Sequence, residues 1–458
     1  MRKTFLLLLF FLPKITLAQV IPSDSIKKAI AGSLTYLAEK QCVETIVGKQ
    51  YAGEWEAYMQ MKAAFLYLGG RHQYRDSNCF TMAGIHNILA EMYLADTSQK
   101  QILPLLQKAF PEVLSYSTGV QFNFWKKLSP NQDLKWGKET NQLVHRPTNF
   151  RLKGRFINNA ANVANDADDT ALGNLAIWYH QKIFGKNDSL KMATSATFDS
   201  FLDKNRNNRH WYNYLFHGFK NSGAYMTWFG QETEFENWHF YKNALHNLIF
   251  FLPISIAYPH PYKAYIPWGT NDVDVIVNAN VLTYLSKNNL RQASKGSESA
   301  NRFIENHTKR GRWNRMGIYY PNRYHLHFTV ARALAAGDTG LLKTAQFLVQ
   351  HLSKTQKQDG SYESKKIVNK HDMFQSTVYA TLAMLYLKES GIKVNKTLID
   401  KSINFLYSQK REENKQVFWK GGVYFSGGTV VRNMLYFTSD AYTTALVSMA
   451  FQKYLKVR

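Results

Sequence analysis

Three carboxylates lie within four positions of the chain, where residues 165–171 read NDADDTA. The apolar residues that follow recur at helical spacing, which predicts that a helix begins here. Asp166 is placed to cap that helix, and Asp169, three positions later, would complete a capping box. These local rules give no role to Asp168.

Asp168 stands between two other acids, and this position favours proton-transfer chemistry. Like-charge repulsion raises the pKa of at least one member of such a cluster and can keep it protonated. A neutral carboxylic acid is the group needed to protonate a weakly basic substrate at neutral pH. The sequence therefore predicts Asp168 as a general acid. The alternative is that the cluster only caps the helix within a solvated acidic turn.

The string Asp-x-Asp-Asp-Thr-Ala resembles the acid motif of class II terpenoid cyclases, the group that includes squalene–hopene cyclase. In that family the middle Asp protonates an alkene or epoxide and starts a carbocation cascade. The resemblance implies that Asp168 is the proton donor, with Asp166 and Asp169 as its flanking partners. It also implies a hydrophobic isoprenoid substrate and an isomerase (intramolecular cyclase) that needs no metal or redox cofactor.

A two-helix unit recurs six times along the chain, and this repeat must position the acids. In each unit an amphipathic helix precedes a more apolar helix that begins after a polar residue. The amphipathic helices are expected at 25–41, 101–117, 189–204, 297–308, 340–355 and 396–409. Their apolar partners are expected at 77–94, 168–184, 273–287, 323–336, 373–389 and 441–455.

Six such hairpins predict an all-α fold, a six-hairpin (α/α)6 toroid with the apolar helices inside, forming one domain over residues 20–458. A two-domain helical array is the alternative. Gln41 is followed by Gly-Glu-Trp55 and Gln356 by Gly-Ser-Tyr362, whereas no such element follows Gln409 directly. These segments resemble the Gln–Trp repeats of the terpenoid cyclase and protein prenyltransferase superfamily.

In such a toroid the apolar helices all begin at one end, so the polar residues at their starts should surround one mouth. These residues are Asp76, Asp166, Asp272, His371 with Asp372, and Asp440. Capping accounts for most of them, and we predict that His371 binds substrate. Asp274 and Asn278 lie one helical turn apart, and a buried Asn needs hydrogen-bond partners. They are expected to form either a structural network or a substrate contact.

Residues 205–268 interrupt the third unit and are rich in aromatic residues. We predict a lid or cleft wall over the mouth, with a short strand at 223–229. A packed surface excursion is the alternative. The aromatic residues expected to bind substrate, by stacking or cation–π attraction, are Trp228, Trp238, Tyr265 and Trp268.

The first nineteen residues have the pattern of a cleaved signal peptide, with a basic start, an apolar core and small residues before position 19. We therefore expect a secreted or periplasmic protein. Its net charge of +24 predicts attraction to anionic partners such as a membrane surface, an acidic polysaccharide or a diphosphate substrate. The basic residues are scattered and no nucleic-acid-binding module is present, so a nucleic-acid partner is not expected.

The chain has two cysteines, Cys42 and Cys79, too few for a thiolate zinc site. They are expected to lie near each other and could form a disulfide in an oxidising compartment.

Two other functions fit the residues. One is a carbohydrate-active (α/α)6-barrel enzyme, a glycoside hydrolase or lyase, in which Asp168 pairs with Asp274 or Asp372. The other is a non-catalytic binding toroid.

Overall fold

The structure is a computed structural model that describes residues 21–61, 73–129, 143–149, 162–204, 221–230, 271–314, 316–364, 371–427 and 435–458. The signal peptide expected at residues 1–19 lies outside the described residues. So do most of the 205–268 insertion and three of the predicted substrate contacts, Trp238, Tyr265 and Trp268.

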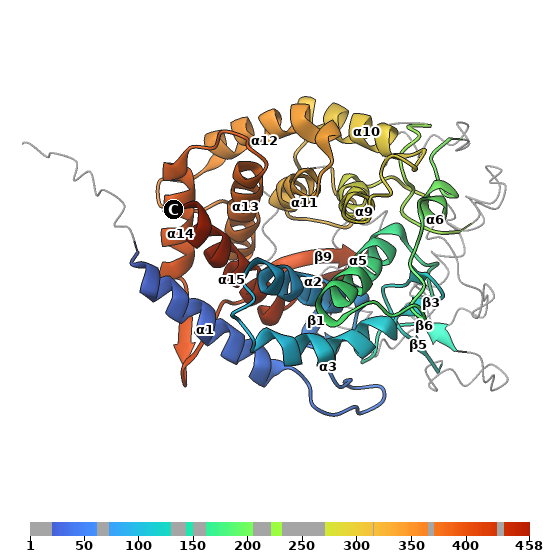
Figure 1. Cartoon of the computed structure of the whole chain (residues 1–458), viewed down its shortest axis with the longest axis horizontal. Helices are drawn as coiled ribbons and strands as arrows, with labels where there is room; N and C mark the ends of the chain where they lie inside the picture. Colours follow the sequence, from blue (N-terminus) through green and yellow to red (C-terminus); the bar gives the residue numbers. More distant parts are fainter. Residues whose placement is uncertain are drawn as a thin grey trace, which may run out of the picture.

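In the part of the chain that the structure describes, apolar helices form the centre of the molecule (Figure 1). They are α2 (Cys79–Ala95), α5 (Ala167–Phe184), α9 (Val275–Lys287), α11 (Arg323–Ala335), α13 (Asp372–Glu389) and α15 (Asp440–Val457). Each contacts the next in this order, and α15 also contacts α2. Their boundaries agree with the sequence prediction to within two residues, because helices that are apolar on most sides must be buried.

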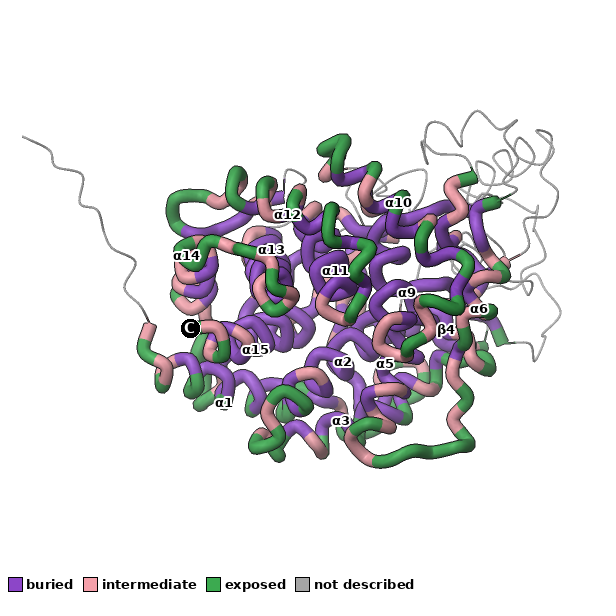
Figure 2. Tube along the Cα trace, turned by 45° about the horizontal axis from the view of Figure 1, so that its top comes forward, coloured by how far each residue is buried: buried purple, intermediate pink, exposed green. Residues whose placement is uncertain are grey.

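Amphipathic helices cover this centre and turn their exposed sides outward (Figure 2). They are α1 (Ser23–Lys40), α3 (Ile102–Leu114), α6 (Ser195–Asp199), α10 (Ser297–Lys309), α12 (Leu342–Thr355, preceded by the 3-10 turn Thr339–Leu341) and α14 (Lys396–Ser408). The helix predicted at 189–204 is shorter in the structure, where it spans only Ser195–Asp199. A capping box between Thr194 and Thr197 starts α6 late, and Leu202 forms an isolated bridge with Tyr225.

The all-α prediction needs a correction, because a four-stranded antiparallel sheet accompanies the helices. Its strands are β1 (Ala57–Met61), β2 (Gln73–Asp76), β9 (Val423–Gly427) and β10 (Leu435–Thr438), in the order β2-β1-β10-β9. Strand β2 leads into α2 and β10 leads into α15, so the sheet connects the starts of the first and last central helices. The predicted strand at 223–229 is reduced to isolated bridges at Tyr225 and Trp228.

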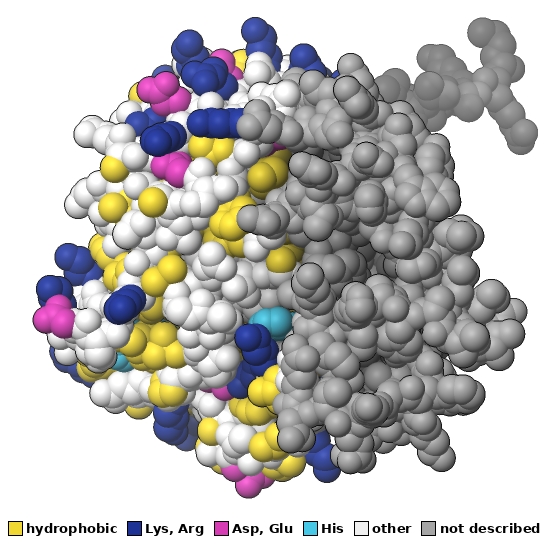
Figure 3. All heavy atoms as spheres, turned by 90° about the vertical axis from the view of Figure 1, so that its right-hand side faces the viewer, with side chains coloured by type: hydrophobic (Ala, Val, Ile, Leu, Met, Phe, Trp, Pro, Cys, Tyr) yellow, Lys and Arg dark blue, Asp and Glu magenta, His cyan; other side chains and the backbone are white. Residues whose placement is uncertain are grey.

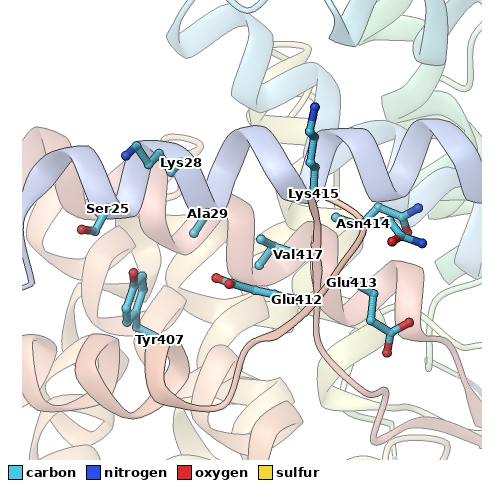
Figure 4. A pocket seen from close by; sticks show the side chains of 10 residues that line it. Ser25, Lys28, Ala29, Tyr407, Glu412, Glu413, Asn414, Lys415 and Val417 are labelled. Carbon is cyan, nitrogen blue, oxygen red and sulfur yellow. The ribbon is translucent and has the colours of Figure 1, made fainter.

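Three small hairpins complete the described part. They pair β3 (Ser117–Thr118) with β4 (Gln121–Phe122), β5 (Lys127–Leu128) with β6 (Val144–His145), and β7 (Arg411–Glu413) with β8 (Gln416–Phe418). The last hairpin packs on α1, where Phe418 stacks on Tyr36 with ring centroids 4.8 Å apart. A 390 Å³ pocket between them is lined mainly by polar and charged side chains and contains none of the predicted site residues (Figure 4).

Glycines in two of the repeats allow successive outer helices to approach closely. Gly53 and Gly360 both have positive φ, +90° and +89°. A Cβ at Gly53 would lie 2.1 Å from the Lys108 carbonyl oxygen, and one at Gly360 would lie 2.2 Å from that of Lys401. Only glycine fits at both positions, since the backbone conformation and the space each exclude a side chain.

The glutamines of these segments hold the same junctions, and the tryptophans bond back to the outer helix that precedes them, in each case through backbone carbonyls. Gln41 donates to Leu105 in α3 at 3.0 Å, and Gln356 donates to Leu398 in α14 at 2.7 Å. Trp55 Nε1 donates to the Leu37 carbonyl at 2.7 Å. In the last unit Trp419, which follows Gln409, donates from Nε1 to the Leu406 carbonyl at the same distance.

Five of the six central helices contribute to an ionic cluster near their carboxyl ends. Glu91 of α2 accepts hydrogen bonds from Tyr386 at 2.6 Å and Tyr179 at 3.3 Å. It also pairs with Lys453 at 3.0 Å and Arg332 at 3.4 Å. Burial disfavours the Glu91 carboxylate, but Lys453, Arg332 and Tyr386 outweigh it and lower its pKa to about 2. This cluster thus links helices that are not neighbours in sequence.

The predicted disulfide is not formed, since both cysteines are free thiols. Cys42 is half-buried, and its sulfur accepts a hydrogen bond from Arg75 at 2.6 Å. Cys79 is fully buried at the start of α2, beside the Asp169 carboxyl. The β1–β2 hairpin separates them in the chain, and each thiol has its own polar partner.

We expect alkylation of the native protein to label Cys42 alone, and labelling after unfolding to reach Cys79 as well. The buried position of Cys79 excludes the reagent until the helix start opens. Intact-mass measurement without reductant should therefore show one adduct natively and two in denaturant. A chain that takes no adduct even in denaturant would instead contain the disulfide.

No helix within the described ranges is long and apolar enough to cross a membrane. Figure 3 shows that Lys and Arg side chains are spread over the described part of one face, between acidic and apolar side chains.

Candidate active site

The acid cluster lies at the first turn of α5, as the sequence predicts. Asp166 is the N-cap, and its Oδ1 accepts a hydrogen bond from the Asp169 backbone N–H at 2.8 Å. The return half of a capping box is not formed, because the Asp166 N–H donates to the Phe122 carbonyl. The Asp169 carboxyl instead lies within hydrogen-bonding reach of the Asp166 carboxyl and the Cys79 thiol.

Asp168 points away from these capping contacts and is held by two side chains from other elements. Asn280 of α9 donates from Nδ2 to Asp168 Oδ1 at 2.7 Å. The Tyr320 hydroxyl, from the segment before α11, donates to Oδ2. Asp168 is only 5% exposed. Both oxygens are therefore fixed in direction within a buried setting.

The three carboxyls are all harder to ionise than usual. Burial raises the pKa of Asp168 well above its ordinary value, and the nearby Asp166 and Asp274 raise it further, while the Asn280 hydrogen bond lowers it. Burial also raises the pKa of Asp166 to about 7, and that of Asp169 well above its ordinary value. The cluster thus favours a protonated Asp168 at neutral pH.

Aromatic rings from separate elements gather beside this acid. They are Phe80 (α2), Tyr320, His325 (α11), Tyr424 and Phe425 (β9), and Tyr442 (α15). Phe80 stacks on Tyr424 with centroids 5.4 Å apart, and its ring lies 5.9 Å from Tyr320. Phe425 meets Tyr320 edge-on at 5.6 Å. Such faces attract a positive charge in a dry environment.

Asp274 and Asn278 are occupied by backbone groups in the structure. Asp274 accepts from the N–H groups of Ile276 and Val277 through Oδ1, and from those of Ile318 and Tyr319 through Oδ2. The contacts to Ile276 and Val277 make it the N-cap of α9, where the sequence predicted Asp272 at the helix start, and the other two hold the segment before α11. They leave Asp274 poorly placed as the second carboxylate of a glycosidase.

Asn278 pairs with the Tyr225 backbone, donating to its carbonyl at 2.9 Å and accepting from its N–H at 3.0 Å. It thereby holds the 221–230 segment against α9. These contacts already satisfy most of the hydrogen-bonding groups of the side chain. They do not test the substrate role of Asn278, which stays a prediction.

Trp228 lies in a chain of hydrogen bonds next to the acid cluster. Its Nε1 donates to the Tyr319 hydroxyl at 3.0 Å, and that hydroxyl donates to Asp272. The Thr227 hydroxyl donates to the other Asp272 oxygen. Trp228 also bridges Asp166 through the backbone, so it lies beside the start of α5.

His371 lines a pocket to which Asp166, Asp168 and Asp169 do not contribute. It is half-buried at the N-cap of α13 and lines a 630 Å³ pocket with Glu56, Lys420 and Asp440, among others. Asp372, the next residue, accepts a hydrogen bond from the Val423 N–H at 2.8 Å. The structure therefore does not bring His371 to the acid cluster.

The sequence analysis missed the two side chains that contact Asp168. Asn280 lies two residues after Asn278 in the same apolar helix, and its polarity there was a usable signal. Tyr320 lies in a loop where many residues are aromatic, so nothing local distinguishes it. Two helix caps also differ from the sequence prediction. Asn78 caps α2 and Ser439 caps α15, where Asp76 and Asp440 were expected.

No family profile and no curated protein sequence matches the chain. Solved structures do resemble it. The type II terpene cyclase MstE from Scytonema superposes with a TM-score of 0.53 at 14% identity, covering 95% of this chain and 100% of the cyclase. A variant of MstE in complex with its substrate geranylgeranyl dihydroxybenzoate gives a TM-score of 0.53 at 13% identity, covering 95% and 99%. The chain is therefore mostly helical and distantly resembles the fold of this type II terpene cyclase.

Proposed function

We propose that this protein is a class II terpenoid cyclase-like isomerase that protonates an isoprenoid alkene from Asp168. The observation that carries the proposal is the buried carboxyl of Asp168, held by Asn280 and Tyr320 and bordered by aromatic rings. The likeness of the fold to a type II terpene cyclase supports it. The proposal includes a six-hairpin toroid whose mouth lies at the starts of the central helices.

Each contact of Asp168 has a role in this reaction. Burial and the neighbouring acids keep the proton on the carboxyl until an alkene is bound. As the proton moves to carbon, Asn280 and Tyr320 donate to the carboxylate that forms, and so stabilise the developing negative charge. The carbocation is stabilised by the faces of rings such as Phe80 and Phe425.

The substrate class follows from the surroundings of the acid and from the ligand of the similar cyclase. MstE binds a geranylgeranyl chain on an aromatic acid, and we propose a polyprenyl chain on an anionic head group for this protein. The net charge of +24 suits such a head group. We also propose that residues 1–19 are removed on export and that the protein acts in the periplasm or outside the cell.

The test is conversion of three probes by the purified mature chain: geranylgeranyl dihydroxybenzoate, geranylgeranyl diphosphate and geranylgeraniol. We expect at least one to give a product of unchanged mass but altered retention, because protonation followed by proton loss only rearranges the carbon skeleton. Conversion of none of them, together with hydrolysis of a polysaccharide, would contradict the proposal.

A further inference from the structure

We propose that His325 is the base that accepts the proton released at the end of the cyclisation. This inference rests on the proposed function and deepens it, because it fixes how the reaction ends. A cascade started by a proton must lose one from carbon to give an alkene, or else capture water. The position of His325 points to the first outcome.

His325 contacts Tyr320, the tyrosine that also contacts the proton donor. It is the third residue of α11 and is 1% exposed. Its imidazole meets the Tyr320 ring edge-on, with centroids 4.7 Å apart, and stacks on Tyr379 at 4.3 Å. Since the Tyr320 hydroxyl contacts Asp168, the acid and the imidazole touch the same tyrosine.

The Nδ1 atom of His325 is buried and has no hydrogen-bond partner within the described ranges. The imidazole contacts the backbone of Tyr424, which favours its charged form, but burial dominates and lowers the pKa of His325 to about 3. The positive end of the α11 dipole acts in the same direction. The ring is therefore a neutral base with a lone pair that no described group uses.

His327, two positions later on the same helix, differs because both of its ring nitrogens have hydrogen-bond partners. Its Nε2 bonds His351 at 2.9 Å, and its Nδ1 lies 3.1 Å from the Arg323 carbonyl oxygen. The two rings diverge, as the i, i+2 spacing predicts. Only His325 faces the aromatic rings beside Asp168.

The proposed steps balance without a further reactant. The alkene π electrons take the proton of Asp168, forming a C–H bond and leaving a carbocation and a carboxylate. A second alkene attacks the cation, forming a C–C bond and moving the positive charge. The His325 Nδ1 lone pair then takes a proton from a carbon next to that charge, and the C–H electrons form the new double bond. Return of this proton from the imidazolium to the Asp168 carboxylate restores both groups.

This arrangement limits where the cascade can end. Because acid and base contact one tyrosine, the carbon that loses a proton must lie close in space to the carbon that gained one. The product is therefore an alkene that carries no added water.

The test compares the products that wild type, His325→Phe and His325→Gln form from geranylgeranyl dihydroxybenzoate, with His327→Gln as matched control. We expect both His325 variants to consume substrate at no less than about a tenth of the wild-type rate. The wild-type alkene should fall by at least about tenfold relative to alcohols or other double-bond isomers. His327→Gln should give the wild-type product, since that side chain faces α12.

Two outcomes separate the inference from the proposed function. Wild-type products in unchanged proportion from folded His325 variants would overturn the base and leave the proton donor intact. No conversion by wild type would overturn both.

NMR of the 15N-histidine-labelled protein gives a check that needs no substrate. It should show His325 neutral, with Nδ1 unprotonated, from about pH 5 to about pH 8. A ring that titrates in this range, or that carries its proton on Nδ1, contradicts the proposal.

Discussion

Asp168→Asn is expected to lower the rate of substrate conversion by about 10²- to 10⁴-fold, the usual contribution of a general acid. Asparagine has the size of the neutral acid but no acidic proton. It can still accept from Asn280 through its oxygen and can donate to the Tyr320 hydroxyl through its amide. The loss should therefore be chemical, and substrate binding measured by native mass spectrometry should change little.

The stability of Asp168→Asn should exceed that of wild type by an amount that grows with pH. The folded-state pKa of Asp168 is raised, chiefly by burial, so the folded state holds its proton more tightly than the unfolded chain. Below the unfolded pKa of about 4, Asp168 is protonated in both states and its burial does not lower the stability of wild type. As the pH rises above this value, the unfolded chain releases the proton that the folded state retains, and wild type loses stability. Asparagine does not titrate, so the melting temperatures should diverge as the pH rises from about 4.

Two variants serve as controls for Asp168→Asn. Asp166→Asn should lose less activity, because asparagine also caps a helix well. Asp440→Asn changes an acid at the start of another central helix, where it pairs with Lys420, and should retain wild-type turnover. Full activity with lost stability in Asp168→Asn would mean that the acid cluster is structural and that the proton donor lies elsewhere.

Glu91→Gln should destabilise the fold by about 3–5 kcal/mol at neutral pH, the cost of breaking a buried ion pair. The substitution keeps the shape of the side chain but removes the carboxylate that pairs with the buried Arg332 and one of the two carboxylates that pair with Lys453. The difference from wild type should shrink in acid. The pKa of Glu91 is lowered to about 2, so its stabilisation is present above the unfolded pKa of about 4.3 and is lost as the pH falls toward 2.

Glu389→Gln is the matched control, since Glu389 contacts the same Lys453 at 2.8 Å but is 54% exposed. It should cost no more than about 1 kcal/mol. Urea unfolding of both variants at about pH 7 and about pH 3 tests the comparison. Equal losses for Glu91→Gln and Glu389→Gln would show that burial of the cluster contributes nothing.

Local patterns predicted the central helices and the position of Asp168, because hydrophobic periodicity and capping depend on residues close in sequence. The partners of Asp168 depend on tertiary packing. Nothing in the string from Asn278 to Asn280 tells which amide meets the 221–230 backbone and which meets the acid. The cysteines show the same limit, since the two thiols expected to pair are free and have different polar partners.

The pairing of β1 with β10 joins Tyr58 to Thr438, residues near opposite ends of the chain. Arg458 likewise donates to the Ile21 carbonyl at 2.8 Å. An open solenoid can lose its last repeat and remain a shorter solenoid. Here, removing the segment from β10 through α15 would expose the apolar faces of α2 and α13 and the edge of β1 at once. The native core therefore cannot form during synthesis until β10 and α15 have been made, and the chain must be kept from aggregating until then.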